Sequence, residues 1–491
     1  MAFRTRFSFA LLSLAACGGD DGGSSAASFP STMTMASMTS PSTGASTTDD
    51  LTTGTSDTTT GGTTTTTTSS PTTTAPTTST TTTDATTTDT SSTTGPVCVD
   101  GTEGCPCLPL ATCLGDLMCI NDVCVGGDTS TSTTDGPPPA CGDGQVAPGE
   151  VCFKPAAALG MGSGPISVVV ADFNKDGNDD IACANNQTNN VTLRTGKGDG
   201  TFNALVALAV GMGPFSIAAP DINNDSAPDL VVANNASNNI SIYQNNGAGM
   251  MIGQPAIPAG TNPRYILATN LNGDDYDDLV VANYGADTIQ VLISDGVGFP
   301  DPAGVNVGDG PYWIDAADMN GDGNLDLVTA NNGAGTLSVS LGNGVGNFGP
   351  PTNSPAGGNV HAVRLADLNG DGDTDAVVTV PAAGQIFVLQ GNGLGGFGGA
   401  IPYPCGEDPL GLLLLDLDGD GRLDAVVANR AANTVTVLRG NGKGGFGAPE
   451  SFPVGGAPHV VAAGDFNNDG AIDLVTANNS DSTVSILLAD P

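Results

Sequence analysis

Residues 318–326 read Asp-Met-Asn-Gly-Asp-Gly-Asn-Leu-Asp, and variants of this acidic stretch occur seven times between Asp172 and Pro491. The copies begin at Asp172, Asp221, Asn270, Asp318, Asp367, Asp416 and Asp465, so that successive copies are 48 or 49 residues apart. A fixed period of this length is typical of solenoids and propellers. The pattern therefore predicts seven copies of one small structural unit.

Each unit contains short apolar segments separated by turns rich in Gly and Asn. In the fourth copy, residues 314–319 lead into the acidic loop, and further strands are expected at 325–330, at 336–341 and after Phe348. Four strands in roughly 49 residues match one blade of a β-propeller, whereas a parallel β-helix of calcium-binding nonapeptides has a far shorter period. We expect an all-β, seven-bladed propeller over residues 153–491.

The ends of the repeat region predict how the ring closes. Each complete copy is followed about 30 residues later by a Phe or Met, but the seventh copy ends before reaching one. Phe153 stands 19 residues ahead of Asp172, which is also the offset of Phe202 from Asp221. An N-terminal strand near Phe153 should therefore complete the last blade beside Ser485, which leaves no free sheet edge.

The charge balance restricts the partners. The chain of 491 residues has 12 Lys and Arg against 51 Asp and Glu, for a formal net charge of −39. Binding of nucleic acid requires clustered cations, so we expect no nucleic acid partner. Divalent cations at the acidic loops would offset much of this charge.

The acidic loops have the residue types that calcium requires. Calcium takes six to eight oxygen ligands, and Asp or Asn at positions 1, 3 and 5, with Gly at position 6 and Asp at position 9, supplies them around a sharp bend. The expected ligands are Asp172, Asn174, Asp176, Asp180, Asp221, Asn223, Asp225, Asp229, Asp274, Asp278, Asp318, Asn320, Asp322, Asp326, Asp367, Asn369, Asp371, Asp375, Asp416, Asp418, Asp420, Asp424, Asp465, Asn467, Asp469 and Asp473.

We expect up to seven structural calcium ions and no catalytic role for them. The loops beginning at Asp221 and Asn270 should bind weakly, because Ser226 and Asp275 replace the Gly at position 6. Magnesium is less suitable, since it favours strict octahedra with retained waters. The alternative without a metal is that Asp and Asn only stabilise the turns.

The N-terminus predicts export and a lipid anchor. Arg4 and Arg6 precede an apolar run and then Leu-Ala-Ala-Cys17, an order typical of a secretory signal over residues 1–16. This segment resembles the lipobox of bacterial lipoproteins, which implies lipid on Cys17 and a location at the outer membrane or cell surface. Residues 17–97 are mostly Thr, Ser, Gly, Pro and Asp, and such a tract is expected to be a disordered tether.

The cysteines predict a disulfide-rich segment over residues 98–152. Six of the eleven lie between Cys98 and Cys124, and Cys141 and Cys152 bracket a further short stretch. In an exported chain these counts favour disulfides over zinc, because His is absent there. Residues 141–152 resemble part of the cysteine-rich repeats of secreted myxobacterial proteins. Cys183 and Cys405 are expected to be small core residues rather than a pair.

The acidic signature together with Phe-Gly at 348–349, 397–398 and 446–447 resembles the FG-GAP and VCBS repeats, which include the propeller of integrin α-chains. The resemblance covers residues 153–491 and implies a calcium-binding propeller. Relatives of this kind often act as binding modules.

Candidate ligand-binding residues precede the first strand of each blade. Because strand direction alternates, they should lie on the face opposite the acidic loops; they are Phe215, Arg264, Tyr265, Tyr312, Trp313, His361 and His459. In the neighbouring turns stand Asn186, Asn235, Tyr284, Asn332, Arg430 and Asn479. Aromatic rings with amides suit a glycan or a protein partner. The alternative, that these side chains plug the channel, remains open.

Three functions follow as hypotheses. The first is a surface-anchored, monomeric, calcium-binding propeller that binds a glycan or an extracellular protein and contacts the membrane only through its lipid. The second is the propeller of an extracellular hydrolase or lyase, for which no nucleophile–base spacing is found. The third is a passive envelope scaffold. We expect a binding module without enzymatic activity.

Overall fold

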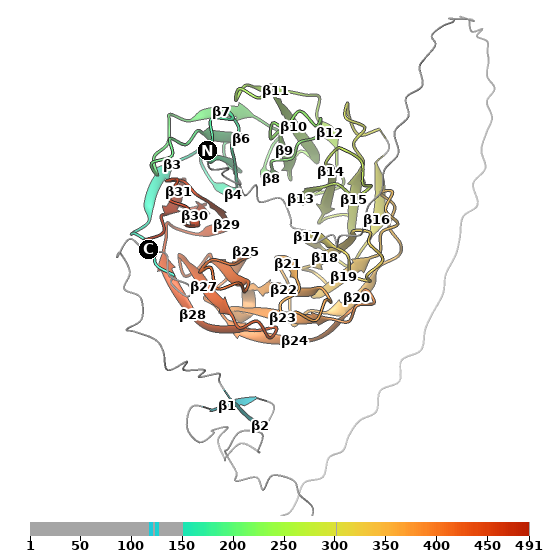
Figure 1. Ribbon diagram of the computed structural model, residues 1–491. Helices are drawn as coiled ribbons and strands as arrows, with labels where there is room; N and C mark the ends of the chain where they lie inside the picture. Colours follow the sequence, from blue (N-terminus) through green and yellow to red (C-terminus); the bar gives the residue numbers. More distant parts are fainter. Residues whose placement is uncertain (1–116, 121–122, 127–150, 301, 491) are drawn as a thin grey trace, which may run out of the picture. The chain divides into compact units, whose positions relative to one another are not determined.

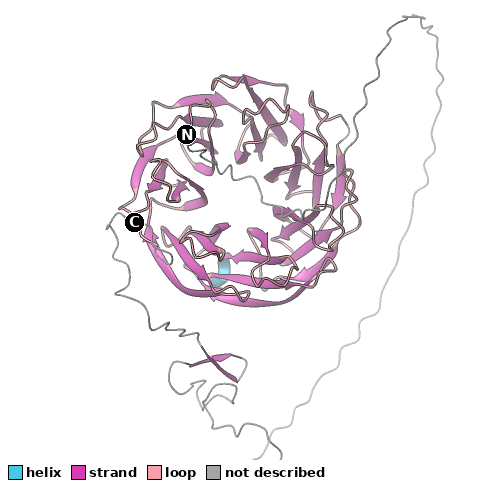
Figure 2. Cartoon of the chain, in the orientation of Figure 1, coloured by secondary structure: helices cyan, strands magenta, loops and turns pink. Residues whose placement is uncertain are grey.

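The computed structural model describes residues 117–120, 123–126, 151–300 and 302–490. Seven antiparallel sheets form a closed ring, with the first strand of each sheet nearest the centre and the fourth at the rim (Figure 1). In the described residues the ring consists of strands and loops with a single helical turn, η1 (Pro381–Ala383) (Figure 2). The predicted seven-bladed propeller is confirmed.

The strands run from the centre outward in chain order. Blade 1 has β4 (Pro165–Ala171), β5 (Asp180–Asn185), β6 (Asn190–Arg194) and β7 (Val206–Ala209); blade 2 has β8 (Pro214–Ala218), β9 (Leu230–Asn234), β10 (Asn239–Asn245), β11 (Met251–Gly253) and β12 (Ile257–Pro258); blade 3 has β13 (Pro263–Thr269), β14 (Asp278–Asn283), β15 (Thr288–Leu292) and β16 (Ala303–Asn306); blade 4 has β17 (Pro311–Ala317), β18 (Asp326–Asn331), β19 (Thr336–Ser340) and β20 (Thr352–Pro355).

The remaining blades follow the same order. Blade 5 has β21 (Val363–Ala366), β22 (Asp375–Val380), β23 (Gln385–Gly391) and β24 (Phe397–Pro404); blade 6 has β25 (Pro409–Leu415), β26 (Asp424–Asn429), β27 (Thr434–Gly440) and β28 (Phe446–Pro453); blade 7 has β29 (Pro458–Gly464), β30 (Asp473–Asn478) and β31 (Thr483–Leu487), with β3 (Ala157–Gly160) as its outer strand.

The N-terminal strand closes the ring, as the Phe153 offset predicts. Strand β3 pairs antiparallel with β31, and Ala158 lies opposite Ser485. Before β3, Phe153 forms a bridge with Ala489, and the Lys154 N–H donates to the Leu488 carbonyl at 2.8 Å. Residues more than 300 positions apart thus share one sheet, and β31 is paired on both sides, by β30 and by β3.

The core lies between the blades. Every residue of the second strands is buried, and in β18 this includes the polar Asp326, Thr329 and Asn331. These strands are covered by neighbouring blades on both sides, so burial does not alternate along them. The outer strand β7, by contrast, is largely exposed.

The cysteine predictions have separate outcomes. Cys183 and Cys405 are free and buried, which confirms them as core residues. Cys152 is disulfide-bonded; the disulfide-rich character of residues 98–152 stays a prediction. A hairpin of β1 (Leu117–Ile120) and β2 (Val123–Gly126) places Cys119 and Cys124 opposite each other in the backbone register. The predictions for Cys17, the signal segment, the tether and Cys141 lie outside the described residues.

Among the described residues, no helix has the length and apolar character needed to cross a bilayer.

Candidate functional site

The acidic loops join the first and second strand of each blade, as predicted. In the fourth loop, both oxygens of Asp318 accept backbone N–H groups, including that of Gly323 at 2.8 Å. Gly321 and Gly323 have φ of 73° and 85°, a left-handed conformation that only Gly adopts without strain. The bend therefore requires positive φ at positions 4 and 6, which Lys175, Asn224 and Asn468 supply at position 4 of other loops. It turns the side chains of positions 1, 3 and 5 toward one another.

Six of the seven loops share this bend. In each, the first carboxylate accepts the N–H of position 6, and in the second loop Ser226 takes the Gly position with φ of 63°. The third loop differs: only Gly273 has a positive φ, and the Asn270 amide donates to the Asp274 carbonyl. The loop that lacks the first carboxylate thus also lacks the shared hydrogen bond.

The Asp at position 9 has a second role, which the sequence does not show. Asp326 is fully buried; its Oδ1 accepts from the Gly342 N–H at 2.7 Å and its Oδ2 from the Met319 N–H at 2.9 Å. The same two bonds recur in all seven blades. This carboxylate therefore fastens the acidic loop to the turn after the third strand.

Burial also changes the acidity of these carboxyls. Desolvation raises the pKa of Asp180 to about 7 and of Asp473 to about 6, although the backbone N–H bonds to each carboxylate oppose the shift.

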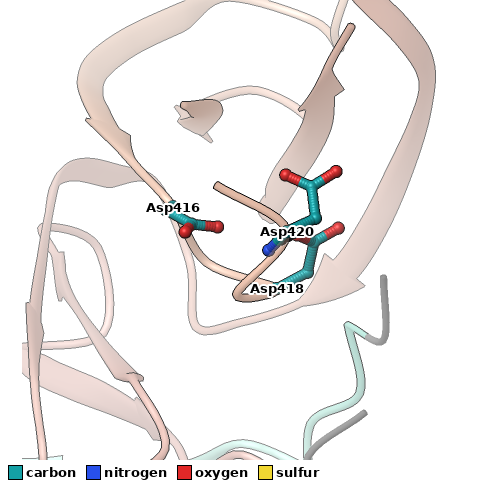
Figure 3. Close-up of side chains that lie close together, drawn as sticks. All are labelled: Asp416, Asp418 and Asp420. Carbon is teal, nitrogen blue, oxygen red and sulfur yellow. Dashed lines mark hydrogen bonds between the residues drawn. The ribbon is translucent and has the colours of Figure 1, made fainter. Parts of the chain in front are cut away.

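The sixth loop has the most closely grouped carboxylates. One oxygen each of Asp416, Asp418 and Asp420 lies within 4.8 Å of the others (Figure 3). Oδ1 of Asp416 and Oδ2 of Asp418 are buried without a hydrogen-bond partner in the described part of the chain. Unpartnered buried carboxylate oxygens are costly, and a hard cation would satisfy them. This triad could hold a metal ion, and the residues present fit calcium.

Two basic side chains lie beside that triad. Arg422 Nη1 is 3.4 Å from Oδ2 of Asp420. Arg439 Nε is 3.7 Å from Oδ2 of Asp418, whose side chain is 1% exposed. In the other loops the residue at position 3 is Asn, and in most of them its amide donates to the carboxylate at position 5, as Asn320 does to Asp322 at 3.0 Å. Asp418 cannot donate in this way, and its nearest cation is Arg439.

The opposite face contains the predicted aromatic residues, at positions where the first strand of the blade is irregular. The β17–β18 register shifts between Pro311 and Trp313, so that Tyr312 is the extra residue. Corresponding shifts occur at Phe215 and Arg264. A bulge redirects a side chain, and the side chains of Phe215, Arg264 and Tyr312 all line one cavity.

Three aromatic side chains pack around Arg264. Its guanidinium carbon lies 4.4 Å from the ring centre of Phe215, 5.1 Å from that of Tyr284 and 5.4 Å from that of Tyr312. Tyr312 in turn lies 4.0 Å from the His361 ring. In the described residues Arg264 forms no ion pair with a carboxylate, so the aromatic faces stabilise its charge.

The seven predicted ligand residues all line one cavity of about 20 Å³, together with Ile166, Ser167, Ser216 and Val460. This volume is roughly that of one water molecule. Trp313 is 5% exposed and stacks on Tyr265 at 4.1 Å, and His361 is 8% exposed. These inner side chains therefore fill the channel, while Phe215, Arg264 and Tyr312 remain partly exposed above them.

The turn amides have a structural role. The Asn332 side chain donates to the Val360 carbonyl of the next blade at 2.9 Å, and Asn186, Asn235 and Asn479 make the equivalent contact. Tyr284 and Arg430 occupy this position in blades 3 and 6; Arg430 instead pairs with Asp408 at 2.6 Å. The amides are thus clamps between blades.

Sequence reasoning missed an ion pair inside the channel. Asp315 and Arg364 occupy the same repeat position in neighbouring blades, and Arg364 Nη1 lies 3.9 Å from Asp315 Oδ2. The same nitrogen donates to the Tyr265 hydroxyl at 3.4 Å. The available signal was a pair of opposite charges at a position that is apolar in the other five repeats.

Comparison with known proteins gives a family match. The model of the FG-GAP-like repeat matches residues 172–232, 221–281, 270–329, 318–378, 367–427 and 416–476, which together span 172–476. No curated protein matches the sequence.

Solved structures resemble the chain at low identity. BBS1N, solved in complex with ARL6DN and soaked with lead, has a TM-score of 0.51 and 16% identity over 69% of this chain and 97% of that one. A lectin of Agrocybe aegerita that recognises non-reducing terminal N-acetylglucosamine has a TM-score of 0.43 and 18% identity, over 67% of this chain and 96% of that one. The periplasmic gluconolactonase PpgL of Pseudomonas aeruginosa has a TM-score of 0.47 and 17% identity, over 60% of this chain and 86% of that one. The likeness to BBS1N shows a shared fold alone.

Proposed function

Because the chain belongs to the FG-GAP-like repeat family, we propose that it is a calcium-stabilised binding module whose channel mouth contacts a glycan or an extracellular protein. The mouth is the surface formed by Phe215, Arg264, Tyr284, Tyr312 and His459. The observation that carries the proposal is the division of chemistry between the two faces: the grouped carboxylates stand on one, and the aromatic side chains around Arg264 on the other.

The calcium part of the proposal rests on the acidic loops. Six loops have one conformation that directs oxygen ligands inward, and the sixth loop has buried carboxylate oxygens without partners. Positions 1, 3, 5 and 9 would hold the ion, and its charge would offset the mutual repulsion of the carboxylates. The second and third loops would bind more weakly. The ions act as clamps between strands, with dissociation constants of about 0.1–1 mM as in extracellular modules.

Thermal unfolding of the full chain tests the calcium part. At a calcium concentration ten times the dissociation constant, each occupied site adds about 1.4 kcal/mol to the free energy of unfolding, so the melting temperature should rise steeply between 0.1 and 10 mM calcium. Magnesium at equal concentration is the control for ionic strength. A melting temperature that is the same in calcium, magnesium and chelator would refute the structural role.

The binding part rests on the mouth. Partly exposed aromatic rings around a cation resemble the surroundings of many ligand sites, which combine aromatic contact with a few polar groups. The test exposes the calcium-loaded chain to an array of glycans and, in parallel, to surface proteins immobilised one by one. The proposal is supported if the chain captures one ligand class and this capture is reduced by Tyr312→Ala but not by Leu394→Ala. Leu394 is the control because it is 81% exposed in the turn after β23, on the acidic face away from the mouth. Equal capture by both variants contradicts the proposal.

We further propose that the module is exported and held at the bacterial outer membrane or cell surface by lipid on Cys17, the only membrane contact of a monomer. The support is the Leu-Ala-Ala-Cys order at residues 14–17 after a short basic and apolar segment. Metabolic labelling with a fatty acid tests it: the chain should carry label, and Cys17→Ser should carry none. Label on both proteins, or on neither, would contradict the anchor.

A further inference from the structure

Three nitrogen atoms around the mouth cavity have no hydrogen-bond partner. They are Nε of Arg264, Nε1 of Trp313 and Nδ1 of His361; all three are buried, and their side chains line the same cavity. Trp313 and His361 are themselves 5% and 8% exposed. Buried polar groups in folded proteins nearly always meet a protein partner, an ordered water or a ligand. Three at one cavity indicate that an occupant belongs there.

The hydrogen-bonding character of these atoms restricts that occupant. Nε of Arg264 and Nε1 of Trp313 can only donate. Burial lowers the pKa of His361, so the ring is neutral, and the backbone of Leu410 partly opposes that shift as a carbonyl acceptor does. Because Nδ1 has no partner, the nitrogen that faces Leu410 is Nε2; with the proton there, Nδ1 is an acceptor. The cavity therefore offers two donors and one acceptor.

A hydroxyl group meets this requirement. Its oxygen accepts two hydrogen bonds and its proton satisfies one acceptor, whereas a carboxylate has no proton to give and an ammonium has no lone pair. The volume of about 20 Å³ admits one oxygen atom and no more. The remainder of a ligand would stay above the cavity.

The rim favours a sugar ring as that remainder. Phe215, Tyr284 and Tyr312 surround the entrance, with the Phe215 and Tyr284 rings 5.8 and 6.0 Å from that of Tyr312. All three rings are partly exposed. Aromatic rings supply apolar contact area to a ligand whose orientation is fixed by a few hydrogen bonds.

We propose that the mouth binds a neutral saccharide and that one of its hydroxyl groups enters the cavity between Arg264, Trp313 and His361. This inference rests on the proposed binding function and specifies its ligand class. In the free protein an ordered water occupies the same position and is displaced by the sugar hydroxyl.

The experiment uses the calcium-loaded full chain and an array of neutral oligosaccharides beside matched oligosaccharides that contain uronic acid. The test variant is Trp313→Phe, which removes the indole N–H and retains an aromatic ring. Its affinity for the neutral oligosaccharides that the wild type binds should be roughly tenfold lower or more, because one donor to a desolvated hydroxyl is lost. Leu394→Ser, on the acidic face, should bind as the wild type does.

Deoxygenated sugars identify the hydroxyl. For the neutral oligosaccharide that binds most tightly, removal of the inserted hydroxyl should lower the affinity of the wild type at least tenfold. The same removal should lower the affinity of Trp313→Phe distinctly less, because that variant has already lost the hydrogen bond to this hydroxyl. Arg264→Met, which retains an apolar stem among the rings, repeats the comparison should Trp313→Phe lower the melting temperature.

The outcomes separate the inference from the function that it extends. The saccharide inference is overturned if Trp313→Phe and Arg264→Met both bind neutral oligosaccharides as tightly as the wild type does. Binding confined to the oligosaccharides that contain uronic acid also overturns it. If the chain captures a surface protein and binds no oligosaccharide, the saccharide inference is wrong and the proposed binding function stands. Absence of any ligand on either array refutes both.

Discussion

The carboxylate of Asp179, in the first repeat, accepts a hydrogen bond of 2.8 Å from the backbone N–H of Asp465, in the last repeat. Beside it, the Asn468 amide donates to Oδ1 of Asn178, also at 2.8 Å. Asp277 makes the same contact with the Asp221 N–H of the preceding blade. Position 8 of an acidic loop can therefore couple it to position 1 of its neighbour, and at Asp179 this contact joins the two ends of the ring.

Replacement of Asp179 by Ala should loosen the ring at its closure. The Asp465 N–H would lose its acceptor, at a cost of about 1–2 kcal/mol in the free energy of unfolding. Native-state hydrogen exchange should show faster exchange at the Asp465 amide and in β29 and β31.

The matched control is Asp277→Ala, which removes the same contact inside the continuous chain. It should accelerate exchange at the Asp221 amide and leave β31 protected. Equal loss of protection in β31 in both variants would mean that closure does not depend on Asp179.

Much of the ring could be predicted, because its information is periodic. The spacing of the acidic loops gives the number of blades, and the Phe153 offset gives the closing strand. The predicted first strand of blade 4 was displaced: residues 314–319 were expected, and β17 spans Pro311–Ala317. Pairing continues past the bulge at Tyr312 toward the mouth, and a bulge places an extra residue opposite a single partner, which the repeat pattern does not reveal.

The partners of individual side chains could not be predicted in the same way. Trp313 is a surface candidate by sequence position, yet its neighbours Tyr265 and His361 come from other blades and bury it. The pairing of Asp315 with Arg364 likewise depends on how adjacent inner strands face each other. Such contacts follow from the stagger between blades, which a repeat pattern does not specify.

The two carboxylates of one loop should respond differently to amidation. Asp375→Asn replaces an acceptor for the Leu368 and Gly391 N–H groups with a side chain that has a donor, so the calcium-free protein should lose about 2–4 kcal/mol of unfolding free energy. Asp371→Asn, at exposed position 5 of the same loop, should change calcium-free stability by less than about 0.5 kcal/mol and reduce the stabilisation by calcium.

Urea unfolding in chelator and in 10 mM calcium measures both effects. The assignment of position 9 as the fastening residue would be wrong if Asp375→Asn unfolded in chelator at the wild-type urea concentration.

Arg439 should weaken calcium binding at the sixth loop. Its guanidinium lies 3.7 Å from Asp418 and occupies the neighbourhood of the triad, so a calcium ion must overcome its charge. The equivalent repeat position holds Gln in blades 2 and 5, as Gln244 and Gln390, so that Arg439→Gln suits the fold. At the partly exposed site the gain should be about 1 kcal/mol, or roughly fivefold in affinity.

Calorimetric titration with calcium detects the change as a shift in one class of sites. Lys197→Gln, an exposed change of the same net charge in blade 1, is the control and should leave the titration unaltered. An equal shift in both variants would assign the effect to overall charge rather than to the contact with Asp418.

The mouth should make stability depend on pH through His459. Burial lowers its pKa to about 4, the nearby Arg430 adds to the shift, and Asp408 opposes it. In the unfolded chain the imidazole titrates near 6.5, so the unfolded state binds the proton first as the pH falls. The stability that the neutral ring contributes is therefore complete above about pH 6.5 and is lost between about pH 6.5 and 4.

Comparison with His459→Gln isolates this contribution, because Gln does not titrate and His361 is common to both proteins. With saturating calcium, the wild type should lose about 1–3 kcal/mol more unfolding free energy than the variant between pH 7 and pH 4. Urea unfolding at intervals of half a pH unit measures the difference. A constant difference across the range would show that the imidazole has the same proton affinity in the folded and unfolded states, and so is not desolvated at the mouth.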